Sequence, residues 1–249
     1  MAERRLAEKR LAVVILHYGQ PELTRRLADQ LAGSDPDWAV RVLDNHAPIP
    51  FPGAWQRLPD NLFWAGALAW CLDELGREGF THLWFLNNDL YFGSAPSHLG
   101  RAWERLHRLD QILGPVGVYS PSATANPYHP QMVQQPGLQF SRAALIDGIA
   151  PLFNLECLTA LGGLDFADNS YGYGVDVWTS LCAHRAGWPV VVDHAVCIRH
   201  VYHSTARKVE GFLAQAARAE AAYLSRRLGP NYAAELMALK AEVQGFEKL

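Results

Sequence analysis

Short apolar runs rich in β-branched and aromatic residues alternate with helical segments through the first half of the chain, and this alternation constrains the fold most. The runs are AVVIL at 12–16, AVRVL at 39–43, HLWFL at 82–86 and VGVY at 116–119. Each has the length and composition of a buried strand. Leucines recur at helical spacing over 23–31, up to Gly33, and over 68–75, up to Gly76. The pattern predicts an α/β fold with a mostly parallel sheet flanked by helices.

Polar residues follow three of these predicted strands. They are His17 and Tyr18, Asp44 and Asn45, and Asn87, Asn88 and Asp89. Turn formation explains any one of these positions, since Asp and Asn favour turns. Ligands of open α/β sheets, however, bind beyond the carboxyl ends of the strands. Three polar strand ends together therefore predict a binding site on one rim of the sheet.

The second half of the chain has a different composition. Residues 121–139 are rich in Pro, Asn and Gln and lack a period, which predicts a long surface loop. A short helix is expected in LECLTAL with Asn154 as its cap, and a second helix over 175–186, closed by Gly187. Two strands, PVVVD and AVCIR, are expected next, the second ending at His200.

Composition indicates one large domain of an ordinary globular protein. The chain has 249 residues, 49% of them hydrophobic, and a net charge of −3, so no bulk positive field favours a polyanion. Four widely spaced cysteines without a CxxC pair are typical of buried thiols in a reducing compartment. No apolar run is long enough to span a bilayer and the start lacks a signal-peptide core. A cytoplasmic protein is expected, either free or peripheral at the inner membrane face.

The order of motifs from about Leu11 to His200 resembles the GT-A glycosyltransferases of family 2, especially the bacterial rhamnosyltransferase-like branch. The opening AVVILHYGQPELTRRLADQL, then VRVLDNHAP, NLFWAGALAW and LWFLNNDLYF follow the family's order. The most specific block is LTALGGLDFADNSYGYGVDVWTSLCAHRAGWPVVVDHAVCIRH. The resemblance covers about four-fifths of the chain, and it implies transfer of a sugar from a nucleotide donor to an acceptor hydroxyl with inversion.

The resemblance places a divalent cation, Mn²⁺ or Mg²⁺, at LWFLNNDLYF. Asp89 is the implied carboxylate ligand and His200, where the family motif ends, the implied imidazole ligand; His203 is a nearby competitor. The family often has Asp at both outer positions of this motif, and here the first is Asn87. A single protein carboxylate is compatible with such ions because substrate phosphates and water complete their shell.

The resemblance also assigns a nucleotide-sugar site. Asp44 would accept a hydrogen bond from the base, with a UDP-, dTDP- or GDP-sugar as donor. The other implied contacts are His17, Tyr18, Asn61, Asn87 and Asn88. Arg207 and Lys208 are further candidates for contact with the diphosphate. Turn formation for Asp44 and Asn61, and packing for Tyr18, are the structural alternatives.

Asp176 is the implied general base. Where the family often reads Glu-Asp-x-Asp, this chain has Val175-Asp176-Val177-Trp178 and keeps one acid. Its position in the first turn of a predicted helix favours the ionised carboxylate, which a base requires. Capping of that helix is the alternative, since Asp is common in first turns.

The tail lies outside the resemblance. We expect a glycosyltransferase domain over 1–205 and a helical extension over 206–249, broken at Gly229-Pro230. The extension is expected to pack on the domain or on a second copy in a homodimer.

Other classes remain open from the sequence. A catalytically impaired module that binds nucleotide sugars would keep the nucleotide site while losing acids. Nucleotidyltransferases and methyltransferases normally have a glycine-rich loop after the first strand, whereas HYGQPE has one glycine. The acceptor is undetermined among a saccharide, a lipid-linked glycan, a protein and a modified nucleic acid.

Overall fold

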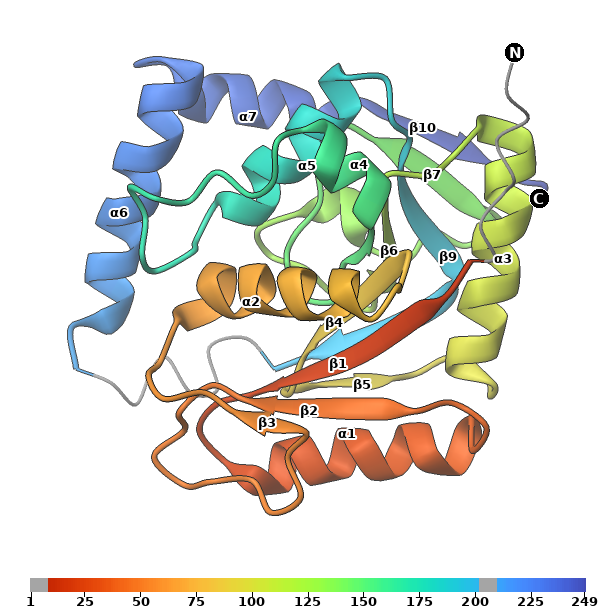
Figure 1. Cartoon of the computed structure of the whole chain (residues 1–249). Coiled ribbons are helices and arrows are strands. Elements are labelled where there is room, and N and C mark those ends of the chain that lie inside the picture. The colour runs from red at the N-terminus through yellow and green to blue at the C-terminus, as the bar shows by residue number, and fades with distance from the viewer. Residues whose placement is uncertain (1–8, 202–209) are drawn as a thin grey trace, which may run out of the picture.

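The computed structural model describes residues 9–201 and 210–249. Within them, the strands belong to one ten-stranded sheet in the order β10-β7-β9-β6-β8-β4-β1-β2-β3, with β5 paired to β9. The helices are α1 (Pro21–Ser34), α2 (Phe63–Arg77), α3 (His98–Leu113), α4 (Leu155–Ala160), α5 (Val175–Arg185), α6 (Phe212–Leu228) and α7 (Tyr232–Ala241). The strands are β1 (Leu11–His17), β2 (Val40–Asp44), β3 (Gln56–Arg57), β4 (His82–Asn87), β5 (Leu90–Phe92), β6 (Val118–Ala123), β7 (Phe140–Ala143), β8 (Leu152–Asn154), β9 (Val190–His200) and β10 (Val243–Phe246). Figure 1 shows this sheet between layers of helices.

The parallel part of the sheet confirms the predicted rim. β1 pairs in parallel with both β2 and β4. Their register places Leu16 beside Asn87 and His17 beside Asp44. The carboxyl ends of three strands therefore meet at one edge, as the polar residues after them predicted.

Short antiparallel strands complete the sheet. β8 lies between β4 and β6 and runs against both. Residues 190–200, predicted as two strands, form the single strand β9. β9 pairs in parallel with β6 from Val190 to Asp193 and again, after a register shift, at Cys197 and Ile198. Its end pairs with β5 in antiparallel fashion, with Leu90 beside His200. This last pairing brings the end of β9 back to the rim.

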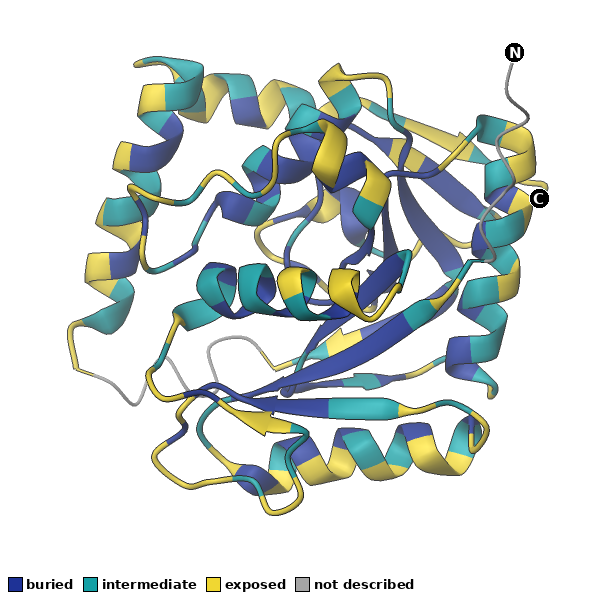
Figure 2. Cartoon of the chain, in the orientation of Figure 1, coloured by how far each residue is buried: buried dark blue, intermediate teal, exposed yellow. Residues whose placement is uncertain are grey.

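Alternate residues of the central strands feed two cores. Val13 and Ile15 of β1 face one side with α1 and α3, and Val14 and Leu16 face the other with α2. Both faces of a parallel strand are buried, which explains its continuous apolar sequence. Figure 2 shows the buried strands between helices whose outer faces are exposed.

The predicted helices form, with shifted ends. α1 matches its prediction closely, whereas α2 continues through Gly76 to Arg77. Asn154 caps α4 by accepting hydrogen bonds from the N–H groups of Glu156 and Cys157. The predicted surface loop at 121–139 is only partly one: β6 extends to Ala123, and several residues further on are buried. The polar composition of this segment did not predict its burial, because polar residues such as Asn126 are buried with hydrogen-bond partners inside the protein.

The C-terminal residues pack on the sheet domain. Tyr223 and Leu224 of α6 and Leu236 of α7 join a core with Val175 and Leu181 of α5. Strand β10, which the sequence did not predict, extends the sheet by pairing with β7. The expected boundary at 205/206 lies outside the described residues.

Two features bear on the membrane and cysteine expectations drawn from the sequence. Among the residues described, no helix has the length and apolar character to cross a membrane. All four cysteines are free, and three are buried while Cys182 is half-buried.

Candidate active site

A cavity of about 720 Å³ opens beyond the carboxyl ends of the central strands. Six residues singled out from the sequence line it: Tyr18, Asn87, Asn88, Asp89, Asp176 and His200. They come from the ends of β1, β4 and β9 and from the start of α5. The fold thus brings together residues as distant in the sequence as Tyr18 and His200.

Asp89 and His200 form a direct pair in this cavity. The β5–β9 pairing sets the two chains side by side, and His200 Nε2 lies 2.8 Å from Asp89 Oδ1. Both side chains are largely buried, at 8% exposure for His200 and 13% for Asp89. An imidazole and a carboxylate that are 111 residues apart in the sequence are therefore within hydrogen-bond distance at the rim.

The pair fits part of a divalent cation's shell. Two neighbouring ligands of an octahedral ion with bonds of about 2.1 Å lie about 3.0 Å apart, close to the 2.8 Å observed. No group of three or more His, Cys, Asp and Glu suited to a metal occurs within residues 9–201 and 210–249. The described protein ligands therefore suit an ion that takes the rest of its shell from phosphate oxygens and water, as Mg²⁺ commonly does.

Asp176 lies in the first turn of α5 but is bonded beyond that helix. Gly148 N–H donates to its Oδ2 at 2.5 Å. Gly148 has no room for a side chain, because a Cβ there would lie 2.9 Å from Trp64 and 3.0 Å from Asp176. Helix capping alone therefore does not explain Asp176, since its carboxylate is held against a separate segment at the cavity.

The ionisation of Asp176 differs from our expectation. Burial, reinforced by the negative charges of Asp147 and Glu220, raises its pKa from 3.8 to about 7. The N–H groups of Val177 and Gly148 act in the opposite direction and are outweighed. The helix terminus does favour the ionised form, as expected, but burial and the neighbouring acids, which the sequence does not reveal, have the larger effect on the pKa. A pKa near neutrality suits a general base.

Several cavity residues were not predicted. Trp64, Tyr128, His129, Asp147, Glu220 and Lys240 also line it. Glu220 and Lys240 come from α6 and α7, in the tail outside the motif order. Asp147 follows an apolar stretch and resembles an ordinary turn residue, so no local signal marks it.

His17 and Asn88 belong to a buried chain of hydrogen bonds beneath the rim. Asn88 Nδ2 donates to Thr24 Oγ1 at 2.9 Å, and Thr24 Oγ1 lies 2.7 Å from His17 Nδ1. His17 Nε2 lies 2.9 Å from the carbonyl oxygen of Ile49, which it can meet only as a donor. The ring of His17 is completely buried and does not line the cavity. It holds the β1 end against the segment after β2.

Asp44 is also engaged within the protein. Its carboxylate accepts hydrogen bonds from Ala47 N–H at 2.8 Å and Phe51 N–H at 3.0 Å, and from Arg57 at 2.6 Å. Burial opposes ionisation, but these bonds outweigh it and keep the pKa of Asp44 below its ordinary value. Asp44 therefore shapes the loop after β2, and its side chain does not line the cavity.

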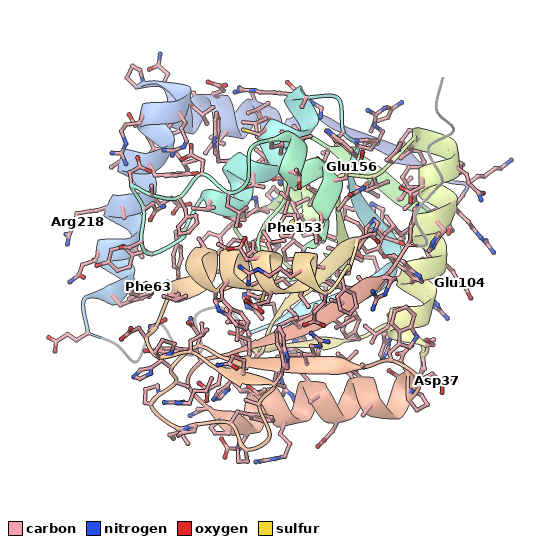
Figure 3. All side chains as sticks on the ribbon, viewed as in Figure 1. Asp37, Phe63, Glu104, Phe153, Glu156 and Arg218 are labelled. Carbon is pink, nitrogen blue, oxygen red and sulfur yellow. The ribbon has the colours of Figure 1, made fainter. Side chains whose placement is uncertain are left out.

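Asn61 has a comparable structural role. Its Oδ1 accepts from Asn45 Nδ2 at 2.9 Å and from Phe63 N–H at 2.8 Å. This fixes the start of α2, where Phe63 stacks on Phe212 of α6 with ring centroids 6.1 Å apart. Figure 3 shows Phe63 at that end of α2. Asn61 thus joins the β2 end to the C-terminal helices and does not line the cavity.

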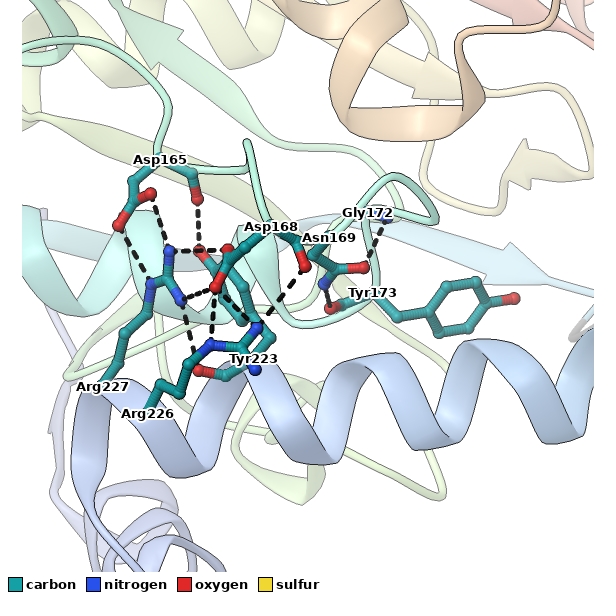
Figure 4. Close-up of polar contacts among 8 residues, drawn as sticks. All are labelled: Asp165, Asp168, Asn169, Gly172, Tyr173, Tyr223, Arg226 and Arg227. Atoms are coloured by element: carbon teal, nitrogen blue, oxygen red, sulfur yellow. Dashed lines mark hydrogen bonds and ion pairs between the residues drawn. The ribbon is translucent and has the colours of Figure 1, made fainter.

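The segment before α5 is tied to α6. Arg226 donates to Asp168 at 2.7 Å, Arg227 donates to Asp165 at 3.0 Å, and Tyr223 donates to the carbonyl of Asp165. Asn169 Nδ2 in turn donates to the carbonyl of Tyr173 at 2.7 Å. Figure 4 shows these contacts. They place Tyr173 at the cavity, where burial and the charges of Glu220, Asp176 and Asp89 raise its pKa to about 12.

Three residues considered in the sequence, His203, Arg207 and Lys208, lie outside the described residues.

Comparison with known sequences gives distant relatives. No family model matches the chain. Uncharacterized proteins of Mycobacterium bovis and Mycobacterium tuberculosis are 27% identical over 208 residues, which is 79% of this chain and 76% of theirs.

Similar solved structures identify the fold as GT-A. A mannosyltransferase of Pyrobaculum calidifontis, in complex with GDP-Man and Mn²⁺, has a TM-score of 0.56 at 17% identity, over 95% of this chain and 76% of its own. GalNAc-T7, with UDP, GalNAc and Mn²⁺, has a TM-score of 0.57 at 11% identity, over 78% of this chain. TarS of S. aureus, in complex with UDP-GlcNAc, also has a TM-score of 0.57 at 11% identity, over 87% of this chain. The match spans 43% of GalNAc-T7 and 66% of that TarS chain. The predicted fold class is confirmed.

Proposed function

We propose that this protein is a glycosyltransferase that moves a sugar from a nucleoside diphosphate donor to an acceptor hydroxyl with inversion. One observation carries the proposal: the Asp89–His200 pair and Asp176 line the same cavity. Structures of similar fold were solved with UDP or GDP-Man and Mn²⁺. The cavity thus combines a candidate cation pair with a carboxylate suited to accept a proton.

Asp176 acts as the base in this proposal. Its carboxylate takes the proton of the acceptor hydroxyl while that oxygen attacks the anomeric carbon from the face opposite the diphosphate. The bond from the anomeric carbon to the diphosphate oxygen breaks, and the electron pair leaves with the diphosphate. Gly148 N–H, donating to Asp176 Oδ2 at 2.5 Å, orients the carboxylate for this transfer.

Asp89 and His200 would hold the cation. A divalent ion held by them would supply positive charge that stabilises the diphosphate leaving group. Tyr18, Asn87 and Asn88 line the same side of the cavity and would contact the donor. His17, Asp44 and Asn61 would act on the donor through the loops that they order, with the base of the nucleotide lying against the loop after β2.

The decisive variant is Asp89→Asn. Hydrolysis or transfer of UDP- and GDP-sugars in Mn²⁺ should fall about 100-fold or more, because the cation supplies several kcal/mol to the developing charge. The exposed Asp37→Asn variant is the control and should keep full activity. Activity of Asp89→Asn equal to that of the wild type would contradict the assignment.

A module that binds nucleotide sugars without transferring them is the second candidate. It is favoured by the incomplete ligand set, since Asn87 takes the place of an acid and the described residues provide only a pair. Calorimetric binding of a nucleotide sugar, with neither hydrolysis nor transfer of any donor tested, would identify this second function.

A further inference from the structure

Part of the cavity lining, here called the second wall, has no role in the proposed binding of the donor and the cation. Tyr128, His129 and Asp147 come from the chain between β6 and β8, and Glu220 and Lys240 come from the C-terminal helices. This wall faces the same space as Asp176.

Glu220 is an acid without a hydrogen bond in the described structure. It is half-buried, and no described residue donates to its carboxylate. Burial raises its pKa, and Lys240 partly offsets that effect. An acid kept in such a place, with open acceptor positions toward a cavity, is suited to receive donors from a ligand.

His129 offers a donor to the same space. It is 8% exposed, and its Nδ1 lies 3.3 Å from Gln131 Nε2. Gln131 Nε2 also donates to the carbonyl of Leu145 at 3.2 Å, which fixes the amide orientation. Nδ1 of His129 must therefore accept, so Nε2 carries the proton. Nε2 has no hydrogen-bond partner among the described residues. Burial lowers the pKa of His129 to about 4, so the ring is neutral.

Carboxyl groups outnumber cations around this space. Asp147 and Glu220 belong to the wall and Asp176 faces it, whereas Lys240 is the one cation among these lining residues. The Nζ of Lys240 donates to the carbonyl of Tyr128 at 2.9 Å. Trp64 and Tyr173 add flat aromatic faces to the lining. Carboxylates accept hydrogen bonds from hydroxyls, but they repel a carboxylate or phosphate placed among them.

We propose that this wall is the acceptor subsite and that it takes the neutral, hydroxyl-rich end of a saccharide in preference to an anionic one. The inference rests on the proposed function and names its acceptor class. Asp147 and Glu220 accept hydrogen bonds from hydroxyl groups of the acceptor saccharide. His129 and Lys240 donate hydrogen bonds to its oxygen atoms. The hydroxyl nearest Asp176 is the one that reacts. The contacts of Arg226 and Arg227 with Asp165 and Asp168 hold α6, and hence Glu220, against the cavity.

The test compares two glycosides that differ in one group. Binding of p-nitrophenyl glucoside and p-nitrophenyl glucuronide to the full chain is measured by saturation-transfer NMR in the presence of UDP and Mg²⁺. The two share a ring, and the second carries a carboxylate in place of a hydroxymethyl group. We expect the glucoside to bind at least tenfold more tightly. Equal or tighter binding of the glucuronide, or no binding of the glucoside, would overturn the proposal.

Variants assign the effect to the wall. Glu220→Lys should reduce the preference for the glucoside at least tenfold, and Glu220→Gln should weaken glucoside binding. Arg218→Gln on the same helix is the control, since Figure 3 shows Arg218 pointing away from the domain, and it should leave both affinities unchanged. A preference that is the same in Glu220→Lys and the wild type would reject the subsite.

Affinity for UDP, measured separately by calorimetry, distinguishes the two proposals. If neither UDP nor GDP binds but the glucoside preference holds, the donor assignment fails and the subsite stands. If a nucleotide binds and the preference is absent, the subsite alone fails.

Discussion

Replacement of Asp176 by Asn should stabilise the protein while abolishing transfer. The pKa of this carboxyl is raised from 3.8 to about 7, chiefly by burial and then by Asp147. A group whose pKa is raised on folding contributes stability below its unfolded pKa, and that contribution is lost as the pH rises through its folded pKa. The protein therefore loses free energy of unfolding between about pH 4 and pH 7 on account of this one group.

The magnitude follows from the shift. A change of about 3 pKa units corresponds to about 4 kcal/mol at most. Asp176→Asn removes the charge, and its amide oxygen can still accept the hydrogen bond that Gly148 N–H donates. At pH 8 the variant should thus gain up to about 4 kcal/mol, with about 2 to 4 °C in Tm for each kcal/mol in a chain of this size. At pH 4, where both side chains are neutral, the gain should vanish.

Urea unfolding of the wild type and Asp176→Asn at pH 4 and pH 8 measures this linkage. The exposed Asp37→Asn variant is the control and should change stability by less than about 0.5 kcal/mol at either pH.

Transfer by Asp176→Asn should fall by orders of magnitude while nucleotide binding is kept. The wild-type rate should rise with pH to a plateau above about 7, because the base must be ionised. A stability difference that is the same at both pH values would refute the reasoning, and a product that retains the donor's configuration would refute the role.

The sequence predicted those elements whose formation depends on the local spacing of apolar residues. The parallel strands and α1 follow from apolar runs and leucine spacing, because burial of both strand faces demands such runs. The position of the polar rim could then be predicted, because the carboxyl ends of parallel strands lie at the same edge of a sheet. The approach of Asp89 to His200 depends on the β5–β9 pairing. Family resemblance anticipated it, whereas spacing along the chain did not.

The other residues of the site could not be predicted, because their positions depend on tertiary packing that has no local sequence signal. Glu220 lies in AQAARAEAAYL, a pattern typical of a solvated helix, and nothing local distinguishes it from the exposed Glu242. Its position at the cavity comes from the packing of Tyr223 and Leu224 on α5. Likewise, Asp44 was predicted as a nucleotide contact, yet a sequence cannot show that three protein donors already engage its carboxylate. That role stays a prediction.

Two further substitutions test the geometry of the site. Asp44→Ala should cost about 1 to 3 kcal/mol, because it leaves donors in the loop after β2 without an acceptor. Urea unfolding measures that cost, and calorimetry should show weaker binding of nucleoside diphosphates; unchanged affinity for all of them would reject its role in the donor site. Gly148→Ala keeps every catalytic group but adds a Cβ that would lie 2.9 Å from Trp64 and 3.0 Å from Asp176. Overpacking of this kind costs about 1 to 3 kcal/mol, and a carboxylate displaced by about 1 Å loses about 100-fold in rate. Gly33→Ala is the matched control, since no atom lies within 4 Å of its added Cβ, and it should leave transfer unchanged. If Gly148→Ala transfers sugar at the rate of Gly33→Ala, the position of Asp176 against residue 148 does not matter for catalysis, and the assignment of Asp176 as the oriented base is wrong.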